Sequence, residues 1–310
     1  MNHVDIEVNK HIELIQVLIY LSERQEKTFQ HLNNVDYFAI IKSYFQRFKK
    51  HEAVKLTTDL IDKNNFIHIK PLRAILSINE IANNIEHPLY KWSVAVKDFV
   101  KVSNFDNFFK NNHDYYCMFE NRYKSYGIEK WLECTELFFK KEFNRYSLIL
   151  CPCTGNYGFI LDIPEKETAY QVEAVPFYDE KGEECWDIAS FAYGTAHEFG
   201  HCFVNPVVEG HKDKLNDLRM FFQSHKNMLY AYNVDYAVMN EYFVRAYSVK
   251  FMKKFKNDFM NFDINAVIER HRKIFIHIDE FIKYLDEYES GDLSFEAFYL
   301  SKLDKISILC

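Results

Sequence analysis

The sequence predicts an α+β fold that is predominantly α-helical, with a small β-sheet placed before one central helix. Glycine and proline are scarce, 8 and 6 in 310 residues, whereas Phe and Tyr number 29 and 21. Few helix breakers and many bulky side chains favour helices around a large core. Most of the glycines and prolines fall between Cys151 and Gly210, so the chain is expected to change character there. We therefore expect a helical N-terminal part over residues 1–143 and a second part over residues 144–310, packed together as one compact unit.

The N-terminal part shows apolar residues at spacings of three and four, the period of an amphipathic helix. This pattern predicts helices in three segments, residues 11–25, 35–63 and 128–144. It returns in the second part over residues 187–203, 212–229, 234–256 and 264–288.

Short apolar runs bounded by turn residues predict strands between these two helical regions. YSLILCP (146–152) ends at Pro152, and YGFILDIP (157–164) follows after a Thr-Gly-Asn turn, so the two are expected to form a hairpin or paired strands. YQVEAVPFYD (170–179) alternates polar and apolar residues and predicts a further strand.

Composition narrows the class of protein. The formal net charge of −7 argues against nucleic acid as a partner. The longest apolar run near the N-terminus, residues 14–21, is too short for a transmembrane segment. Seven cysteines without regular spacing suit a reducing compartment, and Cys151 and Cys153 are interpreted as structural because no second pair follows at zinc-finger spacing. We expect a cytoplasmic monomer, although a secreted protein given without its leader would have the same composition.

The segment TAHEFGHCFVNP (195–206) carries the pattern with the clearest chemistry. His197 and His201 are four residues apart, so on a helix they project from one face and can share a zinc ion. Glu198 is offset by about 100° and can reach a zinc-bound water as general base without being a ligand. Asp187 is expected to cap this helix, and Asn205-Pro206 is expected to end it just after Phe203. The alternative is a buried histidine pair that is satisfied by hydrogen bonds.

A catalytic zinc ion takes three protein ligands and one open position. Glu241 is the candidate third ligand, because it falls within a small or apolar stripe of the predicted helix 234–256 and needs a partner for its charge. Arg245, one turn later, could steady this carboxylate. The alternative is an ordinary Glu–Arg pair on a solvated face. Weaker ligand candidates are His211, His225, Glu209 and Asp217.

HEFGH followed by NEYFVRA (240–246) resembles the gluzincins, zinc metallopeptidases with an HExxH motif and a glutamate ligand that include the thermolysin-like enzymes. The match implies a zincin-like core with Zn²⁺ bound by His197, His201 and Glu241. It departs at Arg245, where thermolysin-like enzymes carry an aspartate that orients a histidine ligand. The wider chain also resembles an uncharacterised bacterial family of gluzincin-like proteins that is classed as a domain of unknown function. This likeness extends over IELIQVLIYLS, YFQRFKKHEAVK, SLILCPCTGNYGF and HEFGHCFVNP.

The sequence thus predicts a zinc-dependent metallopeptidase that hydrolyses a peptide or protein substrate with Glu198 as general base. Its oxyanion donor is left open among Tyr157, Tyr232, Tyr236 and Arg245. We expect residues 147–151 or the turn 153–158 to lie along the cleft, with Asn156 and Tyr157 near the substrate. Two other functions remain open: a zinc-binding protein without turnover, and a metal-free helical interaction protein.

Overall fold

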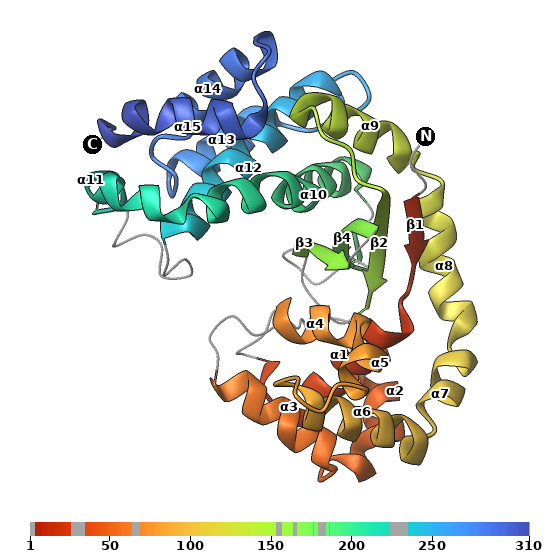
Figure 1. The fold of residues 1–310 in the computed structure, drawn as a ribbon. Coiled ribbons are helices and arrows are strands. Elements are labelled where there is room, and N and C mark those ends of the chain that lie inside the picture. The colour runs from red at the N-terminus through yellow and green to blue at the C-terminus, as the bar shows by residue number, and fades with distance from the viewer. Residues whose placement is uncertain are drawn as a thin grey trace.

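The computed structural model describes residues 4–25, 35–63, 69–152, 157–163, 166–175, 177–178, 184–185, 187–223 and 235–309. Within them the fold is predominantly helical with a small mixed sheet, which confirms the predicted class (Figure 1). One group of helices lies below the sheet in Figure 1 and a second group lies above it. No helix in these ranges combines the length and the apolar character that crossing a membrane requires.

The lower group belongs to the N-terminal part of the chain, and α8 and α9 lead from it to the sheet (Figure 1). The predicted segment 35–63 is interrupted, because a 3-10 turn over Gln46–Phe48 separates two helices. The bounds are α1 Lys10–Ser22, α2 Val35–Phe45, α3 Glu52–Lys63, α4 Ile69–Leu76, α5 Ile78–Ala82, α6 Tyr90–Ser103, α7 Phe105–Asn111, α8 His113–Lys124 and α9 Ile128–Phe139.

The main sheet has the strand order β1-β2-β4-β3. β2 is parallel to both of its neighbours, whereas β3 is antiparallel to β4 and forms one edge. Leu148, Ile149 and Leu150 of β2 are fully buried, as expected of a central strand covered on both faces. The bounds are β1 Val4–Glu7, β2 Arg145–Cys151, β3 Tyr157–Ile163 and β4 Lys166–Ala174, with a separate hairpin of β5 Phe177–Tyr178 and β6 Glu184–Cys185.

Two predictions about the strands were wrong. The runs that form β2 and β3 were expected to pair, but β4 lies between them and pairs with both. The N-terminal residues were interpreted as helical, but Val4–Glu7 form β1, which pairs with β2 about 140 residues later in the chain. Such long-range pairing is set by the buried surface of the whole sheet and not by local sequence.

The upper group contains α10 Ile188–Gly210, α11 Arg219–Gln223, α12 Asp235–Lys254, α13 Ile264–Arg272, α14 Ile278–Ser290 and α15 Phe295–Ser307, with a 3-10 segment over Lys212–Leu218. The predicted helix 264–288 is therefore two helices. The last six residues of the predicted helix 212–229 lie outside the described ranges.

The central helix, α10, begins as predicted, since the Asp187 carboxylate accepts hydrogen bonds from the backbone N–H groups of Ala189 and Ser190 at 3.1 Å each. Its predicted end after Phe203 was wrong, because the helix continues through Pro206 to Gly210. A proline inside a helix removes one hydrogen bond and costs about 3 kcal/mol. Val204 and Val208 are fully buried on either side of it, so packing of the last turns outweighs the local preference.

A buried polar cluster joins the N-terminal helices to the sheet. The Glu13 carboxylate on α1 accepts hydrogen bonds from the Tyr37 hydroxyl at 2.5 Å and from the Cys151 thiol at the end of β2 at 3.3 Å. The Tyr37 and Tyr116 hydroxyls lie 2.7 Å apart. Burial raises the pKa of Glu13 to about 7, although both hydrogen bonds to its carboxylate oppose this shift. Cys151 therefore has a structural role, as predicted, and Cys153 lies outside the described residues.

Candidate metal centre

Two packed helices, α10 and α12, carry the candidate site. Tyr193, His197, His201 and Asn205 follow one another at intervals of four on α10, so their side chains share one face of the helix. Gly200 lets the two helices come close, because a Cβ atom there would lie 3.3 Å from the Tyr247 ring of α12.

Three side chains on these helices converge on one point. The Nε2 atoms of His197 and His201 are 3.3 Å apart. Oxygens of the Glu241 carboxylate lie 3.8 Å from Nε2 of His197 and 3.5 Å from Nε2 of His201. Both histidine side chains are 13% exposed and that of Glu241 is 10% exposed, so the cluster is largely removed from water.

The three side chains are close enough to share one metal ion. Their candidate ligand atoms, one from each residue, all lie within 4.8 Å of one another. Histidine nitrogens and carboxylate oxygens are common metal ligands in proteins. Among the described residues, this is the one group of three His, Cys, Asp or Glu side chains that could hold a metal ion. The predicted ligand set is therefore assembled by the fold.

Charge is balanced around the carboxylate. Nε of Arg245 lies 2.7 Å from Oε2 of Glu241, and its guanidinium group packs over the Phe275 ring at 4.8 Å. Burial alone would raise the pKa of the Glu241 carboxyl, but Arg245 and the two histidines hold it well below its ordinary value. Burial lowers the pKa of His197. It also acts to lower that of His201, but the neighbouring Glu241 carboxylate outweighs it and raises this pKa to about 9.

Glu198 lies beside this cluster without belonging to it. Its side chain is buried, and burial raises its pKa to about 7, against an opposing effect of His201. The backbone N–H of Gly158, at the start of the edge strand β3, donates a hydrogen bond to its carboxylate. Gly158 also touches the backbone of Glu198 so closely that a Cβ atom would lie 1.6 Å from the Glu198 carbonyl oxygen. The edge strand of the sheet and the predicted general base are therefore in direct contact.

Further side chains on α10 support the two histidines. Oδ1 of Asn205 lies 2.9 Å from Nδ1 of His201. The Tyr193 ring stacks near the His197 ring, with centroids 6.5 Å apart and planes 17° apart. The Tyr193 hydroxyl lies 2.7 Å from Nε2 of His271 on α13. Burial, followed by repulsion from Arg245, lowers the pKa of His271 to about 4, so a neutral ring shares this hydrogen bond with the Tyr193 hydroxyl.

The other residues predicted to lie near the substrate are not part of this cluster. Backbone pairing puts Tyr157 opposite Val172 at the start of β3, next to Gly158, which contacts Glu198, and residues 153–156 of the predicted turn lie outside the described residues. The other segment expected along the cleft, residues 147–151, lies inside the sheet between β1 and β4 and does not form an edge. Asn156, Tyr232 and His225 lie outside the described residues. Tyr236 is near the start of α12.

The weaker ligand candidates are engaged elsewhere. His211 pairs with Glu296 at 2.7 Å, and Glu209 accepts a hydrogen bond from Asn240. Asp217 lies exposed on the 3-10 segment.

Sequence reasoning missed Tyr193, Asn205 and Gly158. The first two continue the four-residue spacing of the histidines in both directions, and this signal was present in the sequence. Asn205 did not enter the predicted site because the helix was expected to end before it. Gly158 has no comparable signal, since its role depends on how the sheet meets α10.

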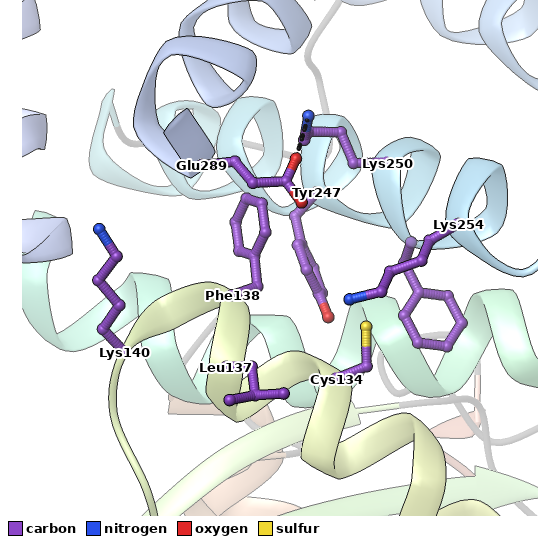
Figure 2. A pocket seen from close by; sticks show the side chains of 9 residues that line it. Cys134, Leu137, Phe138, Lys140, Tyr247, Lys250, Lys254 and Glu289 are labelled. Carbon is purple, nitrogen blue, oxygen red and sulfur yellow. Dashed lines mark ion pairs between the residues drawn. The ribbon is translucent and has the colours of Figure 1, made fainter. Parts of the chain in front are cut away.

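A pocket of about 100 Å³ lies between α9, α12 and α14, and it contains none of the residues of the metal centre (Figure 2). Figure 2 shows the Lys250 amino group paired with Glu289, at 2.8 Å, and the Lys254 amino group directed toward Cys134. Its lining is Cys134, Leu137, Phe138, Lys140, Tyr247, Lys250, Phe251, Lys254 and Glu289. This pocket has no part in the chemistry proposed below.

The protein is thus a predominantly helical α+β protein, and it contains a buried cluster of two histidines and one carboxylate that could hold a metal ion. The chain belongs to the family described as Domain of unknown function (DUF4932), whose model matches residues 77–300. That match includes α10 and α12 and therefore every residue of the cluster. No curated protein and no solved structure matches the chain.

Proposed function

We propose that this protein is a zinc-dependent metallopeptidase of the gluzincin type, with one Zn²⁺ per chain held by His197, His201 and Glu241. The observation that carries the proposal is the convergence of these three side chains, whose candidate ligand atoms lie within 4.8 Å of one another, beside a separate buried carboxylate, that of Glu198. Two imidazole nitrogens and a carboxylate oxygen are a usual ligand set of catalytic zinc. When bound, zinc supplies a Lewis acid that polarises a carbonyl group and lowers the pKa of water.

Glu198 is the general base in this proposal. A carboxyl group whose pKa lies near 7 can, in its ionised form, take a proton from water and then, in its neutral form, pass this proton to the leaving amine. Burial raises the pKa of Glu198 to about 7, which suits both steps. The hydrogen bond from the Gly158 backbone N–H keeps the carboxylate in one place. Arg245 and Tyr157 stay proposed participants: Arg245 holds Glu241, and Tyr157 adjoins Gly158 in sequence.

The edge strand β3 supports a peptide or protein as the substrate. Among the described strands of the main sheet, β3 pairs on one side only, with β4. An extended peptide can add to such an edge through backbone hydrogen bonds. Because β3 begins in contact with Glu198, a peptide lying along it would place a carbonyl group near the general base. The cytoplasmic location and the monomeric state remain predictions.

The proposal is tested by incubating the full-length protein with a peptide library, with and without a chelator, and identifying products by mass spectrometry. Cleavage that the chelator abolishes and added zinc restores is the expected result. The matched variant is Glu198→Gln, which keeps the shape of the side chain and every zinc ligand. Turnover should fall by roughly 10²- to 10⁴-fold, the usual effect of removing a general base, with zinc content unchanged.

The outcomes separate the alternative functions. Zinc binding without cleavage of any peptide would indicate a zinc-binding protein without turnover. Absence of zinc binding would indicate a metal-free helical protein. Equal cleavage by Glu198→Gln and wild type would show that the proposed base is wrong.

A further inference from the structure

Asn205 lies one helical turn after His201 on α10, on the same face as both histidines. Its Oδ1 atom is 2.9 Å from Nδ1 of His201. An amide oxygen only accepts hydrogen bonds, so Nδ1 of His201 must carry the proton and donate. Because Nδ1 keeps its proton, the nitrogen left to bind a metal ion is Nε2, the atom nearest to His197 and Glu241.

The other histidine lacks this support. Nδ1 of His197 is buried and has no hydrogen-bond partner within the described part of the chain. Its ring is placed by stacking near Tyr193, which His271 holds in turn. The two imidazoles are therefore oriented by different interactions. Among the described residues, Asn205 provides the one side-chain hydrogen bond to an Nδ1 atom of the two histidines.

The backbone around Asn205 is helical against its local preference. A residue before proline disfavours the α conformation, yet α10 includes both Asn205 and Pro206. If the helix ended at Phe203, as the local sequence suggests, the carboxamide would not be fixed one turn above His201. The buried side chains of Val204 and Val208 hold this turn in place and thus also hold the hydrogen bond.

We infer that Asn205 is a positioning residue that fixes the tautomer and the ring plane of His201, so that Nε2 faces the metal ion. This inference rests on the metal centre of the proposed function, but it is independent of peptide hydrolysis. Partners of this kind, hydrogen-bonded to the outer nitrogen of a ligand histidine, typically change metal affinity about 10- to 100-fold when they are removed. Asn205 itself is not a ligand and touches neither Glu198 nor Glu241 in the contacts described above.

The test is the zinc dissociation constant of the full-length protein, measured by competition with a chromophoric chelator. Asn205→Leu keeps the four heavy atoms and the branch at Cγ of the side chain but removes the acceptor, so zinc should bind about 10- to 100-fold more weakly. Asn205→Asp restores an oxygen acceptor at the same position and should bind zinc within a few-fold of wild type. Asn216→Ala is the control, because the Asn216 carboxamide donates to the Asp213 carbonyl oxygen on the exposed 3-10 segment.

Thermal unfolding of the metal-free variants shows whether a loss of zinc affinity reflects only a misplaced His201 ring or a loss of the folded structure. If Asn205→Leu is too unstable to purify, Asn205→Ala serves in its place, and the Asp variant must still recover the affinity. Wild-type affinity in the Leu or Ala variant, or an Asp variant as weak as the Leu variant, would overturn the inference. Zinc binding by wild type without peptide cleavage would contradict only the proposed peptidase activity, whereas wild type that binds no zinc would overturn both.

Discussion

Substitution of Gly158 by alanine should disturb the molecule more than its small size suggests. The added Cβ atom would lie 1.6 Å from the carbonyl oxygen of Glu198, 2.4 Å from its carbonyl carbon and 3.0 Å from its Cα. All three atoms belong to the backbone of α10, so no side chain can rotate to make room. Ordinary van der Waals contact begins near 3.4 Å, and therefore β3 and α10 must separate by almost 2 Å.

The separation has two measurable effects. Overpacking of a tight interior site costs about 1–3 kcal/mol, and a clash between two backbone segments places Gly158→Ala near the upper end, about 3 kcal/mol. At about 2–4 °C per kcal/mol for a large domain, the unfolding midpoint should fall by roughly 6–12 °C. The hydrogen bond from Gly158 to the Glu198 carboxylate should also be lost, and a misplacement of about 1 Å can reduce catalysis about 100-fold.

Circular dichroism during heating measures the first effect, and chelator-sensitive peptide cleavage measures the second. Gly210→Ala is the matched control, because nothing lies within 4 Å of a Cβ atom at that position, and its midpoint should not fall. Zinc content should be kept in both variants, since neither glycine lies among the ligands. The contact between β3 and Glu198 would be refuted if Gly158→Ala unfolded within about 1 °C of wild type, a change well under 1 kcal/mol.

Two further predictions address the metal centre and the buried cluster below the sheet. Glu241→Ala should reduce zinc content measured by atomic emission, while His211→Ala should not; the reverse result would disprove the ligand set. Glu13→Gln removes a carboxyl whose pKa burial raises to about 7 from an ordinary 4.5. Its contribution to wild-type stability is complete below pH 4.5 and is lost as pH rises through 7, so the variant should gain about 2–3 kcal/mol relative to wild type between pH 5 and pH 8. Urea unfolding at both pH values checks this, and a pH-independent difference would show that Glu13 is not buried as a neutral acid.

The sequence predicted those features of the site that depend on local spacing. The four-residue interval of His197 and His201 is a property of one helix, and the same is true of Glu241 and Arg245. Asp187 was predicted as the cap for the same reason. That Glu241 meets the two histidines was inferred from the need of a buried carboxylate for a partner and from the likeness to the gluzincins. The structure confirms that Glu241 lies close to both histidines.

Features that depend on distant parts of the chain could not be predicted in this way. The strand β1 has four residues and pairs with residues 146–149, and no local pattern identifies its partner. β4 lies between β2 and β3 because the order of strands reflects how the sheet is covered, not the order of the chain. The end of α10 was placed too early, since the preference of a residue before proline is weaker than the burial of Val204 and Val208.

In the gluzincin assignment that we propose, Arg245 stands where the thermolysin-like enzymes carry an aspartate that orients a histidine ligand, and this difference has a physical consequence. Here the arginine lies 2.7 Å from Glu241, the proposed carboxylate ligand, and the side chain near the proposed histidine ligand His201 is the neutral Asn205. Histidines that bind a metal ion are neutral. Because Arg245 cancels the charge of Glu241, the proposed ligands and their supports would then be neutral together, and Glu198 adds at most one negative charge. A divalent cation would thus leave the site with a net positive charge. Such a site should release its ion to a chelator more readily than one supported by an aspartate, and it should hold a developing negative charge on a substrate carbonyl more strongly.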